Sequence, residues 1–69
     1  METGRIIQLL DREFGFIKRT GVKEHLYFHA DDLIELRFAE LATGDRVQFS
    51  ITESMKGPYA TTVSRYESA

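Results

Sequence analysis

Short stretches of the chain are apolar or alternate apolar and polar residues with a period of two, which is typical of β-strands that bury one face. They are residues 5–10, 14–19, 26–29, 46–52 and 59–63. The clearest case is 46–52, in which Val47, Phe49 and Ile51 alternate with polar side chains. The pattern therefore predicts five short strands.

The segments between these strands carry turn and loop signals. Residues 11–13 are charged, Gly44-Asp45 precedes the fourth strand, and Lys56-Gly57-Pro58 breaks the pattern before the fifth. Residues 31–42 have no period of two, and Asp31 or Asp32 is suited to cap a helical turn. We therefore expect a long connection with one short helical turn between strands 3 and 4.

Five short strands cannot stack as two full sheets, and a small closed barrel hides both their apolar faces and their edges. The predicted fold class is all-β, with a five-stranded antiparallel barrel. Its expected core consists of the inward-facing residues and one from the long connection: Ile6, Ile17, Leu26, Phe28, Leu33, Val47, Phe49, Ile51 and Val63.

Length and composition restrict the possibilities further. A chain of 69 residues predicts one domain, with a barrel over residues 4–65 and a polar C-terminal tail. Without cysteine, and with two histidines, we expect no disulfide, no metal site and no cofactor. No apolar run is long enough to cross a membrane and the first residues do not resemble a secretion signal, so we expect a cytoplasmic location. We also expect the chain to be a monomer.

The net charge of −2 argues against binding a polyanion through bulk electrostatics, so binding has to use local features. Basic residues outnumber acidic ones in the first thirty residues, whereas acidic residues prevail from Asp31 onward.

The ring side chains left over once the core is filled include four in the second and third strands: Phe14, Phe16, Tyr27 and His29. Alternation places them on the outward face of two strands that pair as a hairpin, where exposed rings can stack on the bases of a single strand. Lys18 lies on the same face and is suited to contact a phosphate. The alternative is that Phe14 and Phe16 belong to the core; His29 taken alone fits an ordinary surface residue.

The segments Phe14-Gly15-Phe16-Ile17 and Leu26-Tyr27-Phe28-His29 resemble the two ribonucleoprotein-type motifs of cold-shock domains, in their order and spacing. Gly4, Gly44 and Lys56-Gly57-Pro58 extend the resemblance over nearly the whole chain. The resemblance implies an oligonucleotide-binding barrel that binds single-stranded RNA or DNA with little sequence preference and acts as an RNA chaperone.

The resemblance also implies roles for individual residues. The positions at which the family stacks bases are occupied here by Phe14, Phe16, Tyr27 and His29. Phe38 matches a further aromatic residue in the long loop. The segment from Lys56 to Pro58 matches a loop that borders the site.

The first strand departs from the family pattern. The family usually has lysine, tryptophan, phenylalanine and asparagine at the four positions where this chain has Ile7, Gln8, Leu9 and Leu10. The stacking tryptophan is absent, and either Gln8 or Leu9 takes its place. Ala30 stands where many members have phenylalanine. Losing a stacked ring, at about 1–3 kcal/mol each, predicts weaker binding than a full set of rings provides.

The favoured hypothesis is single-strand binding by the four rings, with Gln8 at the edge of the site and with Lys18, Arg12 and Lys56 contacting phosphates. The alternative is a degenerate barrel that serves as a protein-interaction or regulatory module. We expect neither an enzyme nor a small-molecule substrate, because the carboxylates Asp31, Asp32 and Glu35 have no nucleophile or paired histidine beside them.

Overall fold

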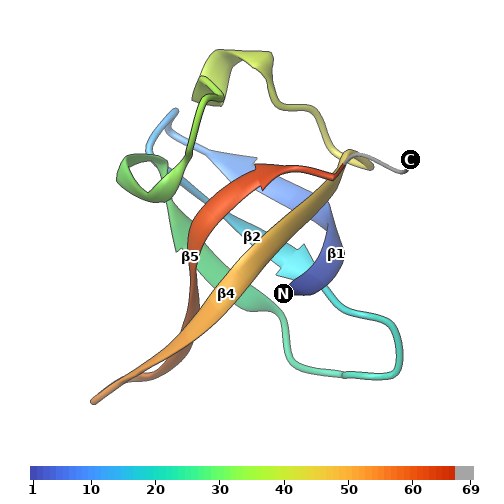
Figure 1. The fold of residues 1–69 in the computed structure, drawn as a ribbon, viewed down its shortest axis with the longest axis vertical. Coiled ribbons are helices and arrows are strands. Elements are labelled where there is room, and N and C mark those ends of the chain that lie inside the picture. The colour runs from blue at the N-terminus through green and yellow to red at the C-terminus, as the bar shows by residue number, and fades with distance from the viewer. Residues whose placement is uncertain (67–69) are drawn as a thin grey trace.

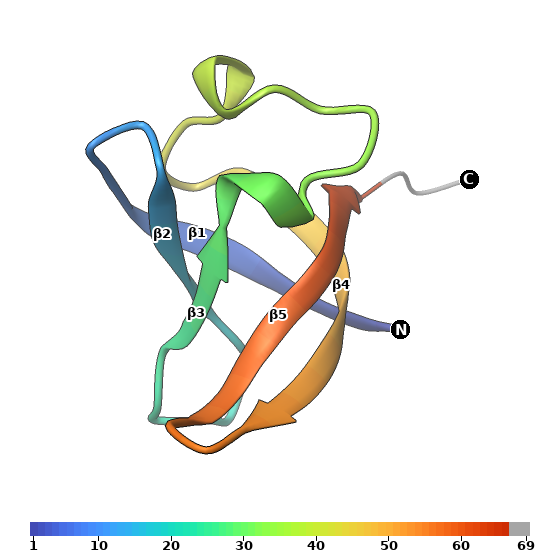
Figure 2. The same cartoon turned by 90° about the vertical axis from the view of Figure 1, so that its left-hand side faces the viewer.

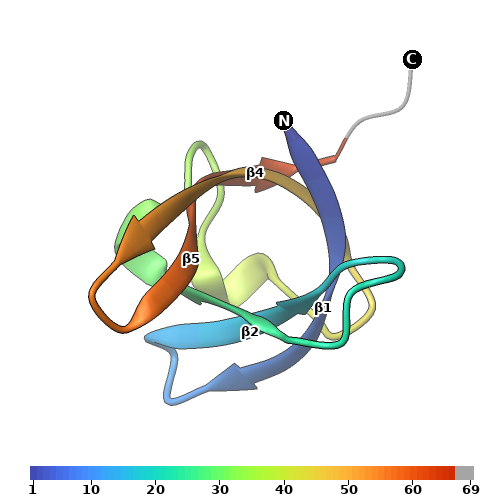
Figure 3. The same cartoon turned by 90° about the horizontal axis from the view of Figure 1, so that it is seen from below.

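The computed structural model describes residues 1–66, which form a closed five-stranded barrel. Its strands are β1 (Glu2–Leu10), β2 (Phe14–Lys18), β3 (Leu26–His29), β4 (Arg46–Ser54) and β5 (Gly57–Arg65). Around the barrel they follow the order β1-β2-β3-β5-β4, with β4 closing onto β1, and Figure 3 looks into the closed ring. From residue 67 on, the predicted polar tail lies outside the described residues.

The strands form where the alternation predicts them, and three are longer than expected. β1 begins at Glu2 and β4 continues to Ser54. Gly57 and Pro58 belong to β5, although their residue types predicted a break. The break is only the two-residue turn between Ser54 and Gly57, and Pro58 is exposed at the start of a strand, where a missing N–H is tolerated.

Neighbouring strands are antiparallel except β3 and β5, which run parallel and lie side by side (Figure 2). The prediction of a barrel is confirmed, whereas an entirely antiparallel arrangement was wrong for this pair. The cause is the long connection after β3, which carries the chain across the end of the barrel before β4 begins (Figure 1). The β4–β5 hairpin then brings β5 back beside β3 in the same direction.

This connection contains two short 3-10 helices, η1 (Ala30–Asp32) and η2 (Phe38–Glu40), where one helical turn was predicted. The cap of η1 is His29, whose Nδ1 accepts the backbone N–H of Asp31 at 3.0 Å. The aspartates that were expected to cap lie within the helix itself. Among the described residues, no helix is long and apolar enough to span a membrane.

Nine side chains are buried in the barrel: Ile6, Ile17, Leu26, Phe28, Leu41, Val47, Phe49, Ala60 and Val63. Seven of them were predicted. Leu33 and Ile51 were also predicted, and they are half-buried against the same cluster. Leu41 from the long connection and Ala60 from β5 complete the core in their stead. The outward-facing side chains of β2 and β3 are therefore not part of the core.

Candidate nucleic-acid interface

The four predicted ring residues lie on the outer surface of β2 and β3. Phe14 is the direct partner of His29 and Phe16 that of Tyr27. Gly15, Ile17, Leu26 and Phe28, which alternate with them, are all buried. Phe14 and Phe16 are thus outside the core, and the alternative that placed them inside is wrong.

Phe14, Phe16 and Tyr27 form a contiguous group of rings, here called the aromatic face. The ring centroids of Phe14 and Tyr27 are 5.7 Å apart and their planes differ by 31°. The ring of Phe16 stands across both, at 84° to Phe14 and 70° to Tyr27, with centroids 6.2 and 6.1 Å away. Such edge contacts are favourable aromatic geometries. The surface is therefore faceted, with two rings in similar orientation and the third in edge contact with them.

The rings differ in how far solvent reaches them. Tyr27 is 38% exposed and so is the side chain of His29, whereas Phe14 and Phe16 are half-buried. His29 is fixed by its cap to η1, because its Nδ1 accepts the Asp31 N–H. In the neutral ring the proton then resides on Nε2, which is a donor.

Gly15 allows the aromatic face to lie directly over the core. A Cβ at this position would be 2.5 Å from the Gln8 carbonyl oxygen and 2.8 Å from the Phe28 ring. Any side chain would force β2 away from β1 or displace the fully buried ring of Phe28. The glycine between the two phenylalanines is thus required by close packing beneath them.

On the β1 side, the aromatic face ends at Gln8. A register shift between Ile6 and Gln8 places Gln8 opposite Phe16, and its side chain is exposed. Leu9 is half-buried and packs against the core. Of the two residues that the sequence left open, Gln8 is therefore the one beside the rings, where it offers an amide in place of an aromatic surface.

On the β3 side, the surface continues onto β5 through Tyr59, the direct partner of Tyr27 in the parallel pair. Between them opens a groove of about 510 Å³. Its lining consists of Tyr27, Ser54, Lys56, Gly57, Pro58 and Tyr59. The predicted residues Lys56 and Pro58 thus lie next to Tyr27, and sequence reasoning missed Tyr59.

The remaining predicted residues lie around this surface. Lys18 is exposed at the end of β2, and Arg12 is exposed in the β1–β2 turn. Phe38, in η2, is half-buried against the core and lies 6.4 Å from the Phe28 ring. Its contact is therefore with a core ring, apart from the aromatic face. Within residues 1–66, no group of three or more histidine, cysteine, aspartate or glutamate side chains is placed to hold a metal ion.

The comparison with protein families covers the barrel from its first strand to the end of its last. Residues 2–66 match the model of the 'Cold-shock' DNA-binding domain. The chain belongs to the cold-shock domain family. Members of this family generally bind nucleic acids and are typically not enzymes.

Curated relatives support this membership. A cold shock-like protein of Aquifex aeolicus is 34% identical over 53 residues, which cover 77% of this chain and 76% of that protein. The cold shock-like protein CspA of Vibrio cholerae is 33% identical over 51 residues, covering 74% and 73%. The solved structure of drosophila Unr CSD456 superimposes with a TM-score of 0.78 at 24% identity. It matches 96% of this chain, which spans 26% of the longer Unr chain, and it shows the shared fold.

Proposed function

We propose that this cold-shock domain binds single-stranded RNA or DNA, with little sequence preference, by stacking bases on the aromatic face. The observation that carries the proposal is the outward group of Phe14, Phe16 and Tyr27, whose rings lie within 6.2 Å of one another on two paired strands. Every base has a flat π-face, so stacking on such rings tolerates any sequence. A monomer suffices for this mode of binding.

The ring orientations suggest different parts for the three residues. Phe14 and Tyr27, whose planes differ by 31°, provide faces for neighbouring bases. Phe16 is in edge contact with both rings and supports them from the side. His29, held by the Asp31 N–H, adds a ring and an Nε2 donor beside Phe14.

Positive side chains at the margins of the aromatic face supply phosphate contacts in this proposal. Lys18 follows Phe16 on the same face of β2, Arg12 lies in the turn before β2, and Lys56 borders the groove. With about two to four phosphates neutralised, the log–log dependence of affinity on salt has a slope of about −1.4 to −2.8. The same contacts bind a strand without catalysing a reaction. Because they occupy unpaired bases, they also favour the melting of weakly paired RNA.

Titration of a pyrimidine-rich oligonucleotide tests the stacking. Tyr27→Ala should weaken binding roughly 5- to 150-fold, which corresponds to about 1–3 kcal/mol for one stacked base. Tyr27→Phe, the matched control, keeps the ring and should keep the affinity within about two-fold. Phe16→Ala should also weaken binding.

Equal affinities of the wild type, Tyr27→Ala and Phe16→Ala would remove the stacking claim. If no single strand binds even at low salt and the domain instead associates with a protein, the barrel is a protein-interaction or regulatory module. Two features favour such a module. Position 8 has a glutamine and no ring for stacking, and Ile34 is 47% exposed and offers an apolar contact to a protein.

A further inference from the structure

Three positively charged residues occupy directly paired positions on three neighbouring strands. Arg5 of β1 is opposite Lys18 of β2 on one side and opposite Arg46 of β4 on the other. We call these residues the cationic row. Like charges directly opposite each other destabilise a sheet. Such a row is unexpected in a chain with a net charge of −2. An anionic partner would offset the repulsion between its three charges.

No carboxylate in residues 1–66 forms an ion pair with a residue of the cationic row. Among residues 1–66, the ion pair between two charged side chains is that of Arg65 with Asp45, while the Asp31 carboxylate lies beside the His29 ring. Asp45, which precedes Arg46, is 3.8 Å from the Arg65 guanidinium and accepts the Ala42 N–H at 3.0 Å. The carboxylate nearest in sequence is therefore already engaged.

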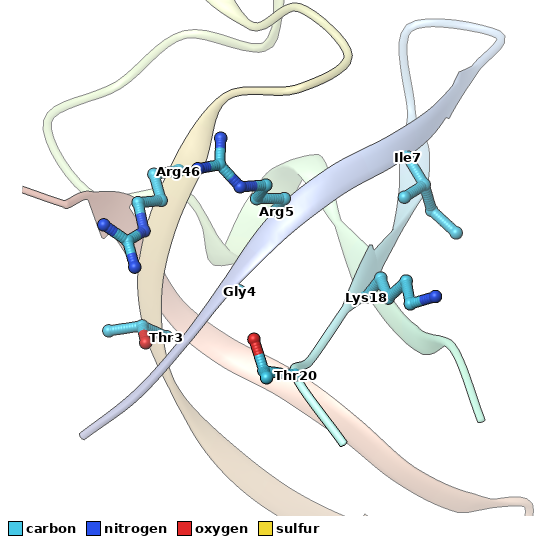
Figure 4. Close-up of a pocket in the computed structure, with 7 residues that line it drawn as sticks. All are labelled: Thr3, Gly4, Arg5, Ile7, Lys18, Thr20 and Arg46. Carbon is cyan, nitrogen blue, oxygen red and sulfur yellow. The ribbon is translucent and has the colours of Figure 1, made fainter. Parts of the chain in front are cut away.

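A cavity of about 230 Å³ lies against the cationic row. Its lining contains no carboxylate and consists of Thr3, Gly4, Arg5, Ile7, Lys18, Thr20 and Arg46. In Figure 4 the Arg5 side chain extends toward Arg46, while Lys18 extends to the other side of β1, beside Ile7. The row thus offers positive groups on both sides of β1, and the hydroxyls of Thr3 and Thr20 line the same cavity as further donors.

Both arginines are held in place by neighbouring groups. Arg5 donates from its guanidinium to the Gly44 carbonyl oxygen at 3.1 Å. The Arg46 guanidinium lies 5.0 Å from the centre of the Tyr66 ring. These contacts use one edge or face of each guanidinium, and a guanidinium has five donors in total. Each guanidinium therefore has donors left for an anion. Because both arginine side chains are already held by these contacts, they lose less conformational freedom on binding an anion than free side chains would.

The cationic row continues the aromatic face. Lys18 is two residues beyond Phe16 on the outward side of β2, a step of about 7 Å along a strand. Arg5 and Gln8 are likewise consecutive outward partners of β2 on β1, opposite Lys18 and Phe16. A single strand stacked on Phe16 and leaving the aromatic face toward Lys18 therefore meets Arg5 and then Arg46.

We infer that the cationic row binds the phosphates of the same single strand beyond its stacked bases, which extends the nucleic-acid site from β2 across β1 to β4. The inference rests on the proposed function. It predicts that Arg46, on a strand that carries no residue of the aromatic face, contacts the phosphate backbone of a long ligand and not of a short one.

The test compares single strands of about 4 and about 12 nucleotides, within the range that one such barrel covers. For the longer strand, the salt slope of Arg46→Gln should be less steep by about 0.7, so the wild type loses about five-fold more affinity than the variant over a ten-fold rise in salt. For the shorter strand, the two proteins should have the same slope. Arg46→Lys keeps the charge and should keep the wild-type slope. Lys23→Gln, the matched control, removes one exposed charge outside the row and should leave both slopes unchanged.

A slope of Arg46→Gln equal to that of the wild type, while Tyr27→Ala still weakens binding, would overturn the inference and leave the proposed function intact. An equal change for both strand lengths would also overturn it, because it would show a general field effect. Equal slopes with Arg46-dependent binding of poly-glutamate would assign the row to an acidic protein. Failure of the wild type to bind either strand would overturn both the inference and the proposed function.

Discussion

Tyr27 and Tyr59 are direct partners across the parallel strands β3 and β5, and they share the groove that Pro58 borders. The same line of paired positions continues through Phe16 to Gln8 on the other side. The rings of this line therefore run from β2 to β5, and β1 contributes only an amide. Because β1 carries no ring on this line, the aromatic surface is displaced toward β5.

Replacement of Tyr59 tests whether this displacement matters for binding. Tyr59→Ala should weaken the binding of a single-stranded oligonucleotide roughly 5- to 150-fold, since it removes about 1–3 kcal/mol of stacking. Thr52, the partner of Tyr59 on β4, is exposed and has no ring, so Thr52→Ala should change the affinity less than two-fold. Fluorescence titration measures both. An unchanged affinity of Tyr59→Ala would confine the site to β2 and β3.

Residue alternation was sufficient to predict the outward rings of β2 and β3. Both strands are short and pair without irregularity, from Phe14 with His29 to Ile17 with Leu26. With a period of two and no bulge, fixing one buried residue fixes the face of all others. The hairpin also makes the partners local in sequence, so the predicted pairing needed no knowledge of the tertiary fold.

The same reasoning fails on β5 because of a bulge. Val63 is buried, and strict alternation from it places Tyr59 inside the barrel. The register of β4 with β5 shifts between Gln48 and Ser50, and Thr62 adopts φ +48° at that point. One extra residue exchanges the two faces, so that Ala60 is buried and Tyr59 faces outward. No residue type in 59–63 signals this bulge, since a threonine rarely adopts a positive φ.

The packing of the long connection was equally inaccessible to pattern analysis. Leu41 is buried and Leu33 half-buried, although both lie in a segment without periodicity. Which of its leucines reaches the core depends on how η1 and η2 cross the end of the barrel. The parallel contact of β3 with β5 depends on the same crossing, and it is this contact that creates the groove beside Tyr27.

Gly15→Ala should destabilise the fold by about 1–3 kcal/mol or more, because the added methyl group meets the Gln8 carbonyl oxygen and the Phe28 ring. Urea unfolding measures the change in the free energy of unfolding. Ser50→Ala, an exposed change on β4, should remain within about 0.5 kcal/mol of the wild type. Wild-type stability of Gly15→Ala would contradict the close packing of β1, β2 and the core ring.

Thr62→Gly should stabilise the domain by about 0.5–1 kcal/mol. A branched residue at φ +48° costs about 1–2 kcal/mol, and glycine relieves this strain at the expense of a more flexible unfolded chain. Ser50→Gly, at an exposed strand position without a positive φ, should instead destabilise by about 0.5–1 kcal/mol. The difference between the two midpoints in urea is the readout. If both variants lose the same stability, the bulge at Thr62 is unstrained.

Gln8→Trp should strengthen the binding of single-stranded nucleic acid roughly 5- to 150-fold. Gln8 is exposed and directly opposite Phe16, so an indole at this position adds one stacking surface, of about 1–3 kcal/mol, at the β1 edge of the aromatic face. Gln8→Leu has apolar area without a π-face and should leave the affinity near that of the wild type. Isothermal titration with an oligonucleotide of about 8 nucleotides, together with the fluorescence of the new tryptophan, distinguishes stacking from a general apolar effect. Equal gains for Trp and Leu would indicate that β1 contributes apolar contact, whereas no gain for Trp would mean that the bound strand does not reach β1.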